Sequence, residues 1–412
     1  MTANPSLPAW RAVFTLTVIA AALGYFADIF DIVLFTMVRK PSMIELGLDP
    51  ATQGTILLDW QLGGMLLGGL VFGILGDLVG RRTAMFASIL TYSIANLANA
   101  CVGWFPVGDN LTQYAALRFL SGFGLAGELG AAIALVSESV PSRSRGYATT
   151  FVAALGISGA VGAWVAATYC PWRWAYVIGG LLGFAVLALR LRVMESSLFD
   201  RAVSSKVRRG DPLLLLRTSW RPFLLCTLIG LPLWFVVGKL VAESINVGKS
   251  LGSPGINPAD CMLWCYVGLV AGDLASGLLS QWLRSRRLAI SIFLVLTGAL
   301  SFGYLAQQQP SQFAMNLWSI ALGLGCGYWA LFVTIGAEQF ATNLRVTAAT
   351  VITNLVRGAV PLWTVVLGYI AVGGLGHLDA LRLLGGALVA IALVATWLLP
   401  ESFGKELDYV ER

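Results

Sequence analysis

Several charged side chains lie deep inside long apolar stretches of this sequence, among them Asp28, Asp31, Arg118 and Arg357. A charge in apolar surroundings persists only when it meets a partner or water, because removing it from water is costly. Carboxylates can take up and release protons, whereas arginine keeps its proton and binds planar anions through two parallel hydrogen bonds. These residue types suit two tasks, proton transfer and anion binding, and the surrounding elements must position them.

Composition places these charges in a membrane. Hydrophobic residues make up 57% of the 412 residues and charged residues only 12%, with a mean hydropathy of +0.78, whereas a soluble protein carries about 25% charged residues. The six cysteines fall in or at the ends of apolar runs, and the single histidine, His377, has no neighbour that could share a metal. We therefore expect no disulfide framework, no metal site and no cofactor.

Twelve apolar stretches are long enough to cross the membrane, since a helix of about 20 residues spans a hydrocarbon core of about 30 Å. The first is too long for a cleavable signal and contains two aspartates. The sequence thus predicts an all-α polytopic membrane protein. The stretches cover residues 12–37, 54–76, 83–104, 112–137, 147–169, 172–190, 222–241, 260–281, 288–307, 312–335, 347–372 and 380–399.

Basic residues orient these spans, because short loops rich in Lys and Arg stay in the cytoplasm. Most Lys and Arg residues fall on one side if the N-terminus lies inside, and the linker 191–219 belongs to that side. We expect both termini in the cytoplasm and the chain in a bacterial inner membrane, with the lipid bilayer around it. The net charge of +6 follows from this distribution and indicates no nucleic-acid partner.

The two halves of the chain resemble each other. "SESVPSRSRG" at 137–146 aligns with "AEQFATNLRV" at 337–346, and "GILGDLVGRR" at 73–82 has a weaker counterpart in "GLLSQWLRSRR" at 277–287. Such repetition indicates a fold built from two similar halves. We predict a six-helix half at 1–190, a cytoplasmic linker at 191–219, a second six-helix half at 220–399 and a cytoplasmic tail at 400–412.

Three segments resemble the major facilitator superfamily, in particular its sugar-porter and metabolite:proton symporter branches. They are "GILGDLVGRR", "RFLSGFGLAGELGAAIALVSESVPSRSRG" at 118–146 and "PESFGKELDYVE" at 400–411. The resemblance implies twelve transmembrane helices in two pseudo-symmetric six-helix halves around a central cavity. It also implies a secondary active transporter that works by alternating access, not an enzyme. We expect a monomer that moves a small-molecule substrate together with protons.

The motif between spans two and three implies a cytoplasmic gate. Its glycines allow close helix approach and a sharp turn, and its arginines hold the loop at the cytoplasmic face. The resemblance implies that Asp77 contacts the start of span eleven, where a helix N-terminus favours a carboxylate; a plain capped turn is the alternative. The predicted gate set is Asp77, Gly73, Gly80, Arg81, Arg82, Glu138, Arg145, Glu338 and Arg345.

The acids of span one are candidates for proton coupling. Asp28 and Asp31 are one helical turn apart, so they repel each other unless a cation intervenes. The resemblance to symporters implies that this cation is Arg118 and that Asp31, in "FD", is the coupling acid. Asp28 is the alternative, and Glu128 in the span of Arg118 completes the set. A static ion pair that serves only the structure is the other interpretation.

Arg357 and Asp273 lie in spans that line the cavity in this fold. They either pair with each other, or Arg357 stays available for a substrate carboxylate or phosphate. Aromatic and amide side chains on cavity-lining spans are pocket candidates, although each could equally pack or lie at the membrane interface. The predicted substrate set is Arg357, Asp273, Gln61, Trp60, Trp234, Tyr328, Trp329 and Asn354.

Two departures from the family narrow the substrate. Span seven, "LLCTLIGLPLWFVVGKL", lacks the paired glutamines of sugar porters, and "GISGAVGAWVA" in span five lacks the Gly-Pro pair of drug antiporters. We therefore expect proton-coupled symport of a small organic acid or related polar metabolite. A facilitator or exporter of the same fold is the alternative, followed by a receptor or scaffold that does not transport.

Overall fold

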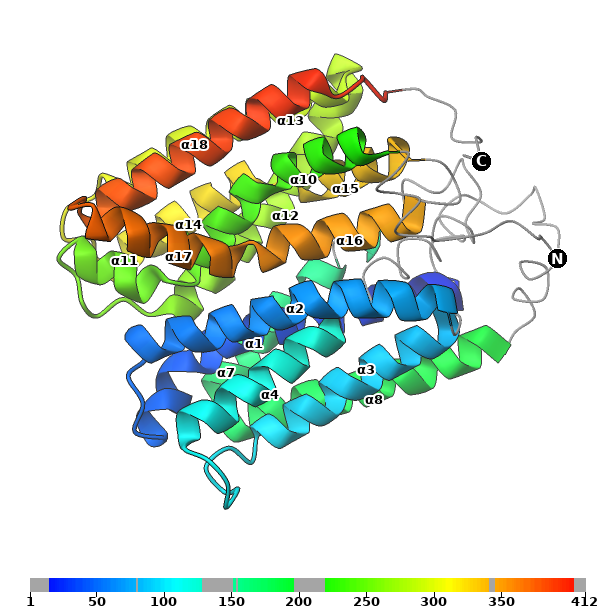
Figure 1. The fold of residues 1–412 in the computed structure, drawn as a ribbon, viewed down its shortest axis with the longest axis vertical. Coiled ribbons are helices and arrows are strands. Elements are labelled where there is room, and N and C mark those ends of the chain that lie inside the picture. Colours follow the sequence, from blue (N-terminus) through cyan, green and yellow to red (C-terminus); the bar gives the residue numbers. More distant parts are fainter. Residues whose placement is uncertain are drawn as a thin grey trace.

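The protein is described here by a computed structural model, which covers residues 15–78, 81–127, 151–152, 155–195, 219–340 and 345–403. Within these ranges the regular secondary structure is entirely helical. Figure 1 shows two helical bundles side by side, one built from α1 to α8 and the other from α10 to α18. We call them the N-terminal and C-terminal halves.

The described residues of the N-terminal half form six of the labelled helices. They are α1 (Leu16–Glu45), α2 (Thr52–Leu78), α3 (Arg81–Asn99), α4 (Asn110–Leu125), α7 (Gly159–Tyr169) and α8 (Trp172–Glu195). The C-terminal half is more interrupted. It contains α10 (Trp220–Phe235), the π-helical turn η2 (Val236–Val241), α11 (Ser244–Ser250), α12 (Pro258–Leu283), α13 (Arg286–Leu305), α14 (Gln312–Cys326), α15 (Trp329–Glu338), α16 (Arg345–Gly358), α17 (Val360–Val372) and α18 (His377–Leu398).

The described helices lie where the spans are predicted, but several of them are not continuous. Nine helical segments within the described residues are long and apolar enough to cross a membrane. Spans seven, ten and eleven are each interrupted: span seven by the π-helical turn η2, span ten at 327–328 and span eleven at Ala359. The Gly and Pro of "GLPLWFVVG" at 230–238 predict a break in span seven, whereas spans ten and eleven are predicted as single helices, because hydropathy registers apolar length but not such breaks.

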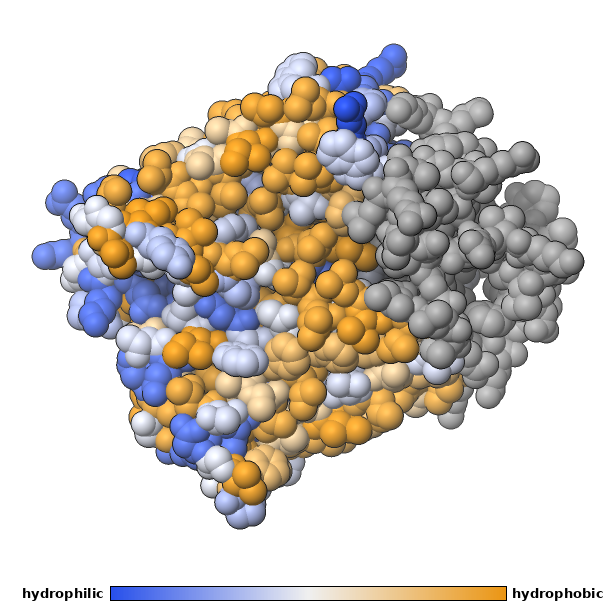
Figure 2. Space-filling view, viewed as in Figure 1, coloured by the Kyte–Doolittle hydropathy of each residue, from blue (hydrophilic) through white to orange (hydrophobic). Residues whose placement is uncertain are grey.

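The surface fits a membrane. Large apolar side chains are exposed along the helices, among them Leu278, Phe313, Val372 and Leu398, and Figure 2 shows apolar residues covering the middle of the visible face. Polar residues gather at the end that carries the α1–α2 connection (Figure 2). Because the sequence places this connection outside the cell, we call this end the predicted outer end.

Each half is held together by a close crossing of two glycine-bearing helices. A Cβ atom on Gly64 of α2 would stand 2.2 Å from the carbonyl oxygen of Phe119 on α4. In the C-terminal half, a Cβ on Gly268 of α12 would stand 2.0 Å from the carbonyl oxygen of Ile320 on α14. Small residues at such crossings let membrane helices approach backbone to backbone. The same crossing in both halves is the structural form of the repeat seen in the loops.

We predict that Gly64→Ala lowers the thermal stability of the purified protein, because the added methyl group must push α2 and α4 apart; overpacking of this kind costs about 1–3 kcal/mol. Gly63→Ala is the matched control, since a Cβ on Gly63 would meet no atom within 4 Å. The unfolding midpoint in detergent should fall for the first variant and stay level or rise for the second. Equal midpoints would show that the crossing is looser than described.

Candidate functional site

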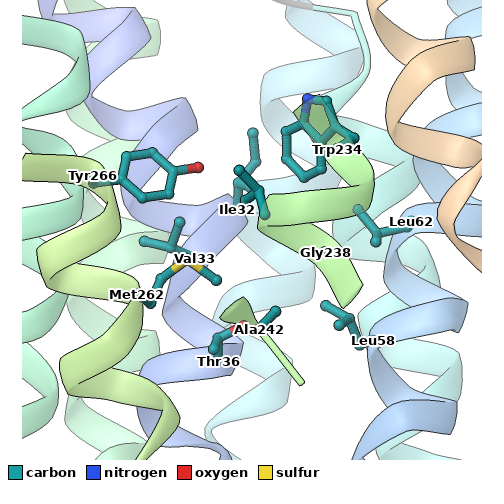
Figure 3. A pocket seen from close by; sticks show the side chains of 11 residues that line it. Ile32, Val33, Thr36, Leu58, Leu62, Trp234, Gly238, Ala242, Met262 and Tyr266 are labelled. Atoms are coloured by element: carbon teal, nitrogen blue, oxygen red, sulfur yellow. The ribbon is translucent and has the colours of Figure 1, made fainter. Parts of the chain in front are cut away.

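A small cavity lies between the two halves. It is a narrow gap, partly open to the outside, between α1 and α2 on one side and α10, η2 and α12 on the other. Its walls are mainly apolar, and Figure 3 shows Trp234 and Tyr266 on opposite sides of it, with Ile32 between them. In this conformation the space is little larger than one water molecule, so a ligand can enter it only after the surrounding helices move apart.

Arg357 lies next to this cavity between two tryptophans. Its guanidinium carbon is 5.3 Å from the ring centroid of Trp234 and 5.3 Å from that of Trp329, and the two indoles meet edge to face at 6.5 Å. The arginine is only 2% exposed. Among the described residues, none of the ion pairs involves Arg357, and its Nε has no hydrogen-bond partner. Aromatic faces attract this cation without using its N–H donors.

Two tyrosines complete the surroundings of Arg357. Tyr25 of α1 and Tyr266 of α12 are both buried and lie within electrostatic range of the guanidinium, and Tyr25 also contacts the indole of Trp329. The indole N–H of Trp234 is buried and, among the described residues, has no acceptor. A buried cation, a donor without an acceptor and several aromatic faces thus meet at the edge of an apolar cavity.

Asp273 does not form the predicted pair with Arg357. Its Oδ1 accepts the backbone N–H of Ala330 at 3.0 Å, at the beginning of α15. Of the two predicted arrangements, the structure therefore does not show the Arg357–Asp273 pair, and the binding of a substrate anion by Arg357 stays a prediction. The helix break that Asp273 caps was not visible in the sequence.

The other predicted substrate residues have mixed positions. Gln61 is buried and donates to the carbonyl of Ile32 at 3.2 Å, and Asn354 donates to the carbonyl of Ala126 at 2.8 Å across the two halves. The Tyr328 hydroxyl donates to the carbonyl of Ile229. Trp60 is 50% exposed and does not line the cavity, because its neighbour Gln61 takes the inward face of α2.

The span-one acids and Arg118 lie in a buried part of the N-terminal half. Asp31 is 1% exposed, and its Oδ1 lies 2.5 Å from where a Cβ on Gly179 would stand. Arg118 is fully buried, donates to Ser121 at 3.2 Å and lies over the ring of Tyr176 at 5.3 Å. Asp28 lies within electrostatic range of Arg357. The two acids therefore face different surroundings, whereas the sequence placed them on one shared face.

Two ion pairs join the halves near the predicted outer end. Arg39 of α1 binds both carboxylate oxygens of Glu243, at 3.1 and 3.2 Å, with side chains 1% and 6% exposed. Lys239 of η2 binds Asp59 of α2 at 3.4 Å. A third contact, the indole N–H of Trp164 donating to Asp260 at 3.0 Å, also crosses between the halves. Together these contacts hold the predicted outer end closed.

Most of the predicted cytoplasmic gate lies outside the described residues. Gly80, Glu138 and Arg145 of this gate set lie outside the described residues, as do the side chains of Asp77, Arg81, Arg82 and Arg345 and the surroundings of Gly73. Glu128 of the proton-coupling set also lies outside the described residues. Their roles stay predictions.

Glu338, the one described member of the gate set, binds Arg286 at 3.2 Å and accepts from Ser402 of the tail motif at 2.6 Å. The neighbouring Glu401 accepts from Ser285 and from the backbone N–H of Arg286. Burial alone would raise the pKa of Glu401, but these hydrogen bonds outweigh it and lower the pKa to about 2. The tail motif thus ties the ends of α13 and α15 together.

Sequence reasoning assigned no role to Tyr25, Tyr266 or the ion pairs between the halves. The sequence holds one indication that Arg39 faces the interior: it lies eight residues after Asp31 and so falls near the same face of α1. Its partner, Glu243, is 204 residues away in the sequence. Only the packing of the two halves reveals that pair.

Comparison with known proteins agrees with this architecture. A family model described as Major Facilitator Superfamily matches residues 20–364. The niacin transporter NiaP of Acinetobacter baylyi is 25% identical over 98% of this chain and 98% of that protein. A gentisate transporter of Corynebacterium glutamicum is 26% identical over 80% of this chain and 76% of that protein.

A solved structure of the same superfamily has the same fold. It is the proton:xylose symporter XylE bound to 6-bromo-6-deoxy-D-glucose, which matches with a TM-score of 0.69 and 15% identity over 97% of this chain and 98% of that chain. Because the family model extends over most of the chain and the relatives align with most or all of it, this protein belongs to the Major Facilitator Superfamily and is an integral membrane transporter, not an enzyme.

Proposed function

We propose that this protein is a proton-coupled symporter that carries a small aromatic carboxylic acid by alternating access. One observation carries this proposal: Arg357 is buried between two tryptophans, and among the described residues no carboxylate pairs with it. Asp28 lies within electrostatic range of Arg357 but forms no ion pair with it within the described part of the chain, and a buried charge without a direct partner is unfavourable. A substrate carboxylate supplies that partner and matches the two-pronged geometry of the guanidinium.

The aromatic part of the proposal rests on the cavity wall. Trp234 lines the cavity and also contacts Arg357, so a flat ring in the cavity lies beside the cation that binds its carboxylate. The indole N–H of Trp234 supplies a further donor. Two relatives support this class, since they are named for niacin and gentisate, and both compounds are aromatic carboxylates. The sequence predicts a small organic acid as the substrate, and we narrow this prediction to an aromatic carboxylic acid.

Proton coupling is assigned to Asp31 with Arg118. A carboxylate at this depth is stable when it is ionised beside a cation or when it is protonated. Arg118 keeps its proton, so the cluster changes state only at the carboxylate. Protonation of Asp31 weakens its attraction to Arg118 and lets α1 move against α4, and release of the proton restores the first arrangement. In this proposal the proton site lies in the N-terminal half and the substrate site lies between the halves, and α1 contributes residues to both.

A facilitator or exporter of the same fold differs from this symporter in one property. It moves substrate without an inward proton gradient, or against the direction proposed here. Uptake by reconstituted vesicles with and without that gradient separates these functions, and a scaffold would show no uptake.

We predict that Asp31→Asn allows exchange but not accumulation. The neutral amide mimics the protonated acid, so the carrier still reorients with substrate bound but has no proton step to drive it. The measurement is uptake of labelled nicotinate or benzoate into proteoliposomes, with counterflow as the exchange assay.

Asp28→Asn is the parallel variant, because Asp28 is the alternative coupling acid. If each single variant retains full proton-driven accumulation, neither acid couples transport to protons, and both are structural.

We predict that Glu243→Gln opens the predicted outer end. The substitution leaves Arg39 buried without its carboxylate, which costs about 3–5 kcal/mol in the closed state, enough to shift most of the population. A cysteine introduced at Thr36 in the cavity wall, in a background without the native cysteines, should then react faster with an impermeant maleimide.

Glu45→Gln is the matched control for that experiment. It breaks the Arg173–Glu45 pair at 3.1 Å, which lies within the N-terminal half and has a glutamate side chain 54% exposed. Exposed pairs contribute little, so labelling should not change. A Glu243→Gln protein that labels at the original rate would remove the gating role of this pair.

A further inference from the structure

The interruption of span ten lies directly beside Arg357. α14 ends at Cys326 and α15 begins at Trp329. A helix that begins inside the membrane exposes backbone N–H groups, and lipid cannot satisfy them. Tyr328, which precedes the first turn of α15, makes no side-chain hydrogen bond to these groups. The start of α15 therefore needs an acceptor from another helix.

Asp273 of α12 supplies that acceptor. Its Oδ1 accepts the N–H of Ala330 at 3.0 Å, and the N–H of Trp329 also contributes to holding the carboxylate. The helices cross closely here, because a Cβ on Gly327 would stand 2.2 Å from the backbone of Gly272, the residue before Asp273. This crossing places the carboxylate at the helix N-terminus, where a negative charge is favourable.

One residue, Trp329, connects the capped start of α15 with the Arg357 site. Trp329 is the first residue of α15, its indole lies over the guanidinium of Arg357 and it meets Trp234 edge to face. A shift of the first turn of α15 would therefore move one wall of the Arg357 site. Asp273 itself makes no ion pair with Arg357 among the described residues.

We propose that Asp273 is a positioning residue: it fixes the first turn of α15, so that Trp329 holds Arg357 in the orientation that receives the substrate carboxylate. The proposal rests on the proposed function, and it assigns Asp273 neither a substrate contact nor the proton. Only Oδ1 is engaged, whereas Oδ2 is buried and, within the described part of the chain, has no hydrogen-bond partner. A neutral side chain with one acceptor oxygen therefore meets the requirement.

Two substitutions separate the cap from the charge. Asp273→Asn keeps an acceptor for the N–H of Ala330, whereas Asp273→Ala removes both acceptor and charge. With benzoate as the probe, we expect the asparagine variant to bind at least as tightly as the unsubstituted protein. The alanine variant should bind on the order of five- to tenfold more weakly, the scale of a lost helix cap.

A double-mutant cycle tests whether the effect passes through Trp329. In a Trp329→Ala background, Asp273→Ala should cause no further loss of benzoate affinity, because the side chain that it positions is gone. In a Trp60→Ala background, the loss should persist in full, since Trp60 is half exposed and lies outside the site.

Hydrogen exchange gives a readout that needs no ligand. Amides 329–332 should exchange faster in Asp273→Ala than in Asp273→Asn, because only the alanine variant lacks the cap. Equal affinity or equal exchange in the two variants would overturn the proposal, as would an Asp273→Ala effect that persists without Trp329. If the unsubstituted protein does not bind benzoate, the proposed function is rejected instead. The exchange rates alone then show whether Asp273 caps the start of α15.

Discussion

The guanidinium of Arg357, held by two indole faces and by no described carboxylate, is the interaction on which the site depends. A cation buried at this depth needs compensation, and aromatic faces supply only part of it. They also leave its hydrogen-bond donors available. The surrounding architecture keeps this arrangement: Trp234 comes from the helix that continues into the π-helical turn, and Trp329 comes from the first turn of a helix that begins within the membrane. Each of these irregular elements therefore adjoins a tryptophan that packs against Arg357.

Other buried charges also need compensation, and they obtain it by pairing with a charge of opposite sign. Arg39 and Glu243 satisfy each other with a two-pronged contact, and Lys239 lies against Asp59, so these charges stabilise one arrangement of the two halves. Pairs of this kind are strong while closed and costly when one partner is removed. They suit a contact that must hold one state firmly and be exchanged for other contacts in another. Arg39, Glu243, Lys239 and Asp59 thus join the halves as ion pairs, whereas Arg357 forms no ion pair within the described part of the chain and is the proposed ligand-binding cation.

Much of this architecture could be predicted from the sequence, and the reasons are local. Apolar runs gave the spans, and motifs with glycine and arginine gave the family and the internal repeat. Trp234, Trp329 and Arg357 were selected because they are polar or aromatic groups on predicted cavity helices. The break in span seven could be predicted from the Gly and Pro of 230–238, whereas the break in span ten could not, since Cys326 to Trp329 is as apolar as its surroundings. The role of Asp273 depends on that break. The sequence predicts Trp60 as a cavity residue, although Trp60 does not line the cavity. Neighbouring residues on a helix face different directions, and hydropathy does not fix the rotation of a helix that is apolar all round.

The most direct test of the account is the affinity of the purified protein for benzoate compared with benzamide, measured by isothermal titration calorimetry in detergent. The two ligands have the same ring and nearly the same shape, and they differ in the charge offered to Arg357. The account predicts that benzoate binds at least about tenfold more tightly than benzamide, since a charge-assisted hydrogen bond contributes about 1.5–3 kcal/mol. It also predicts that Arg357→Lys, which keeps the charge but loses the two-pronged geometry, narrows this difference. Equal affinities for the two ligands in the unsubstituted protein would contradict the account.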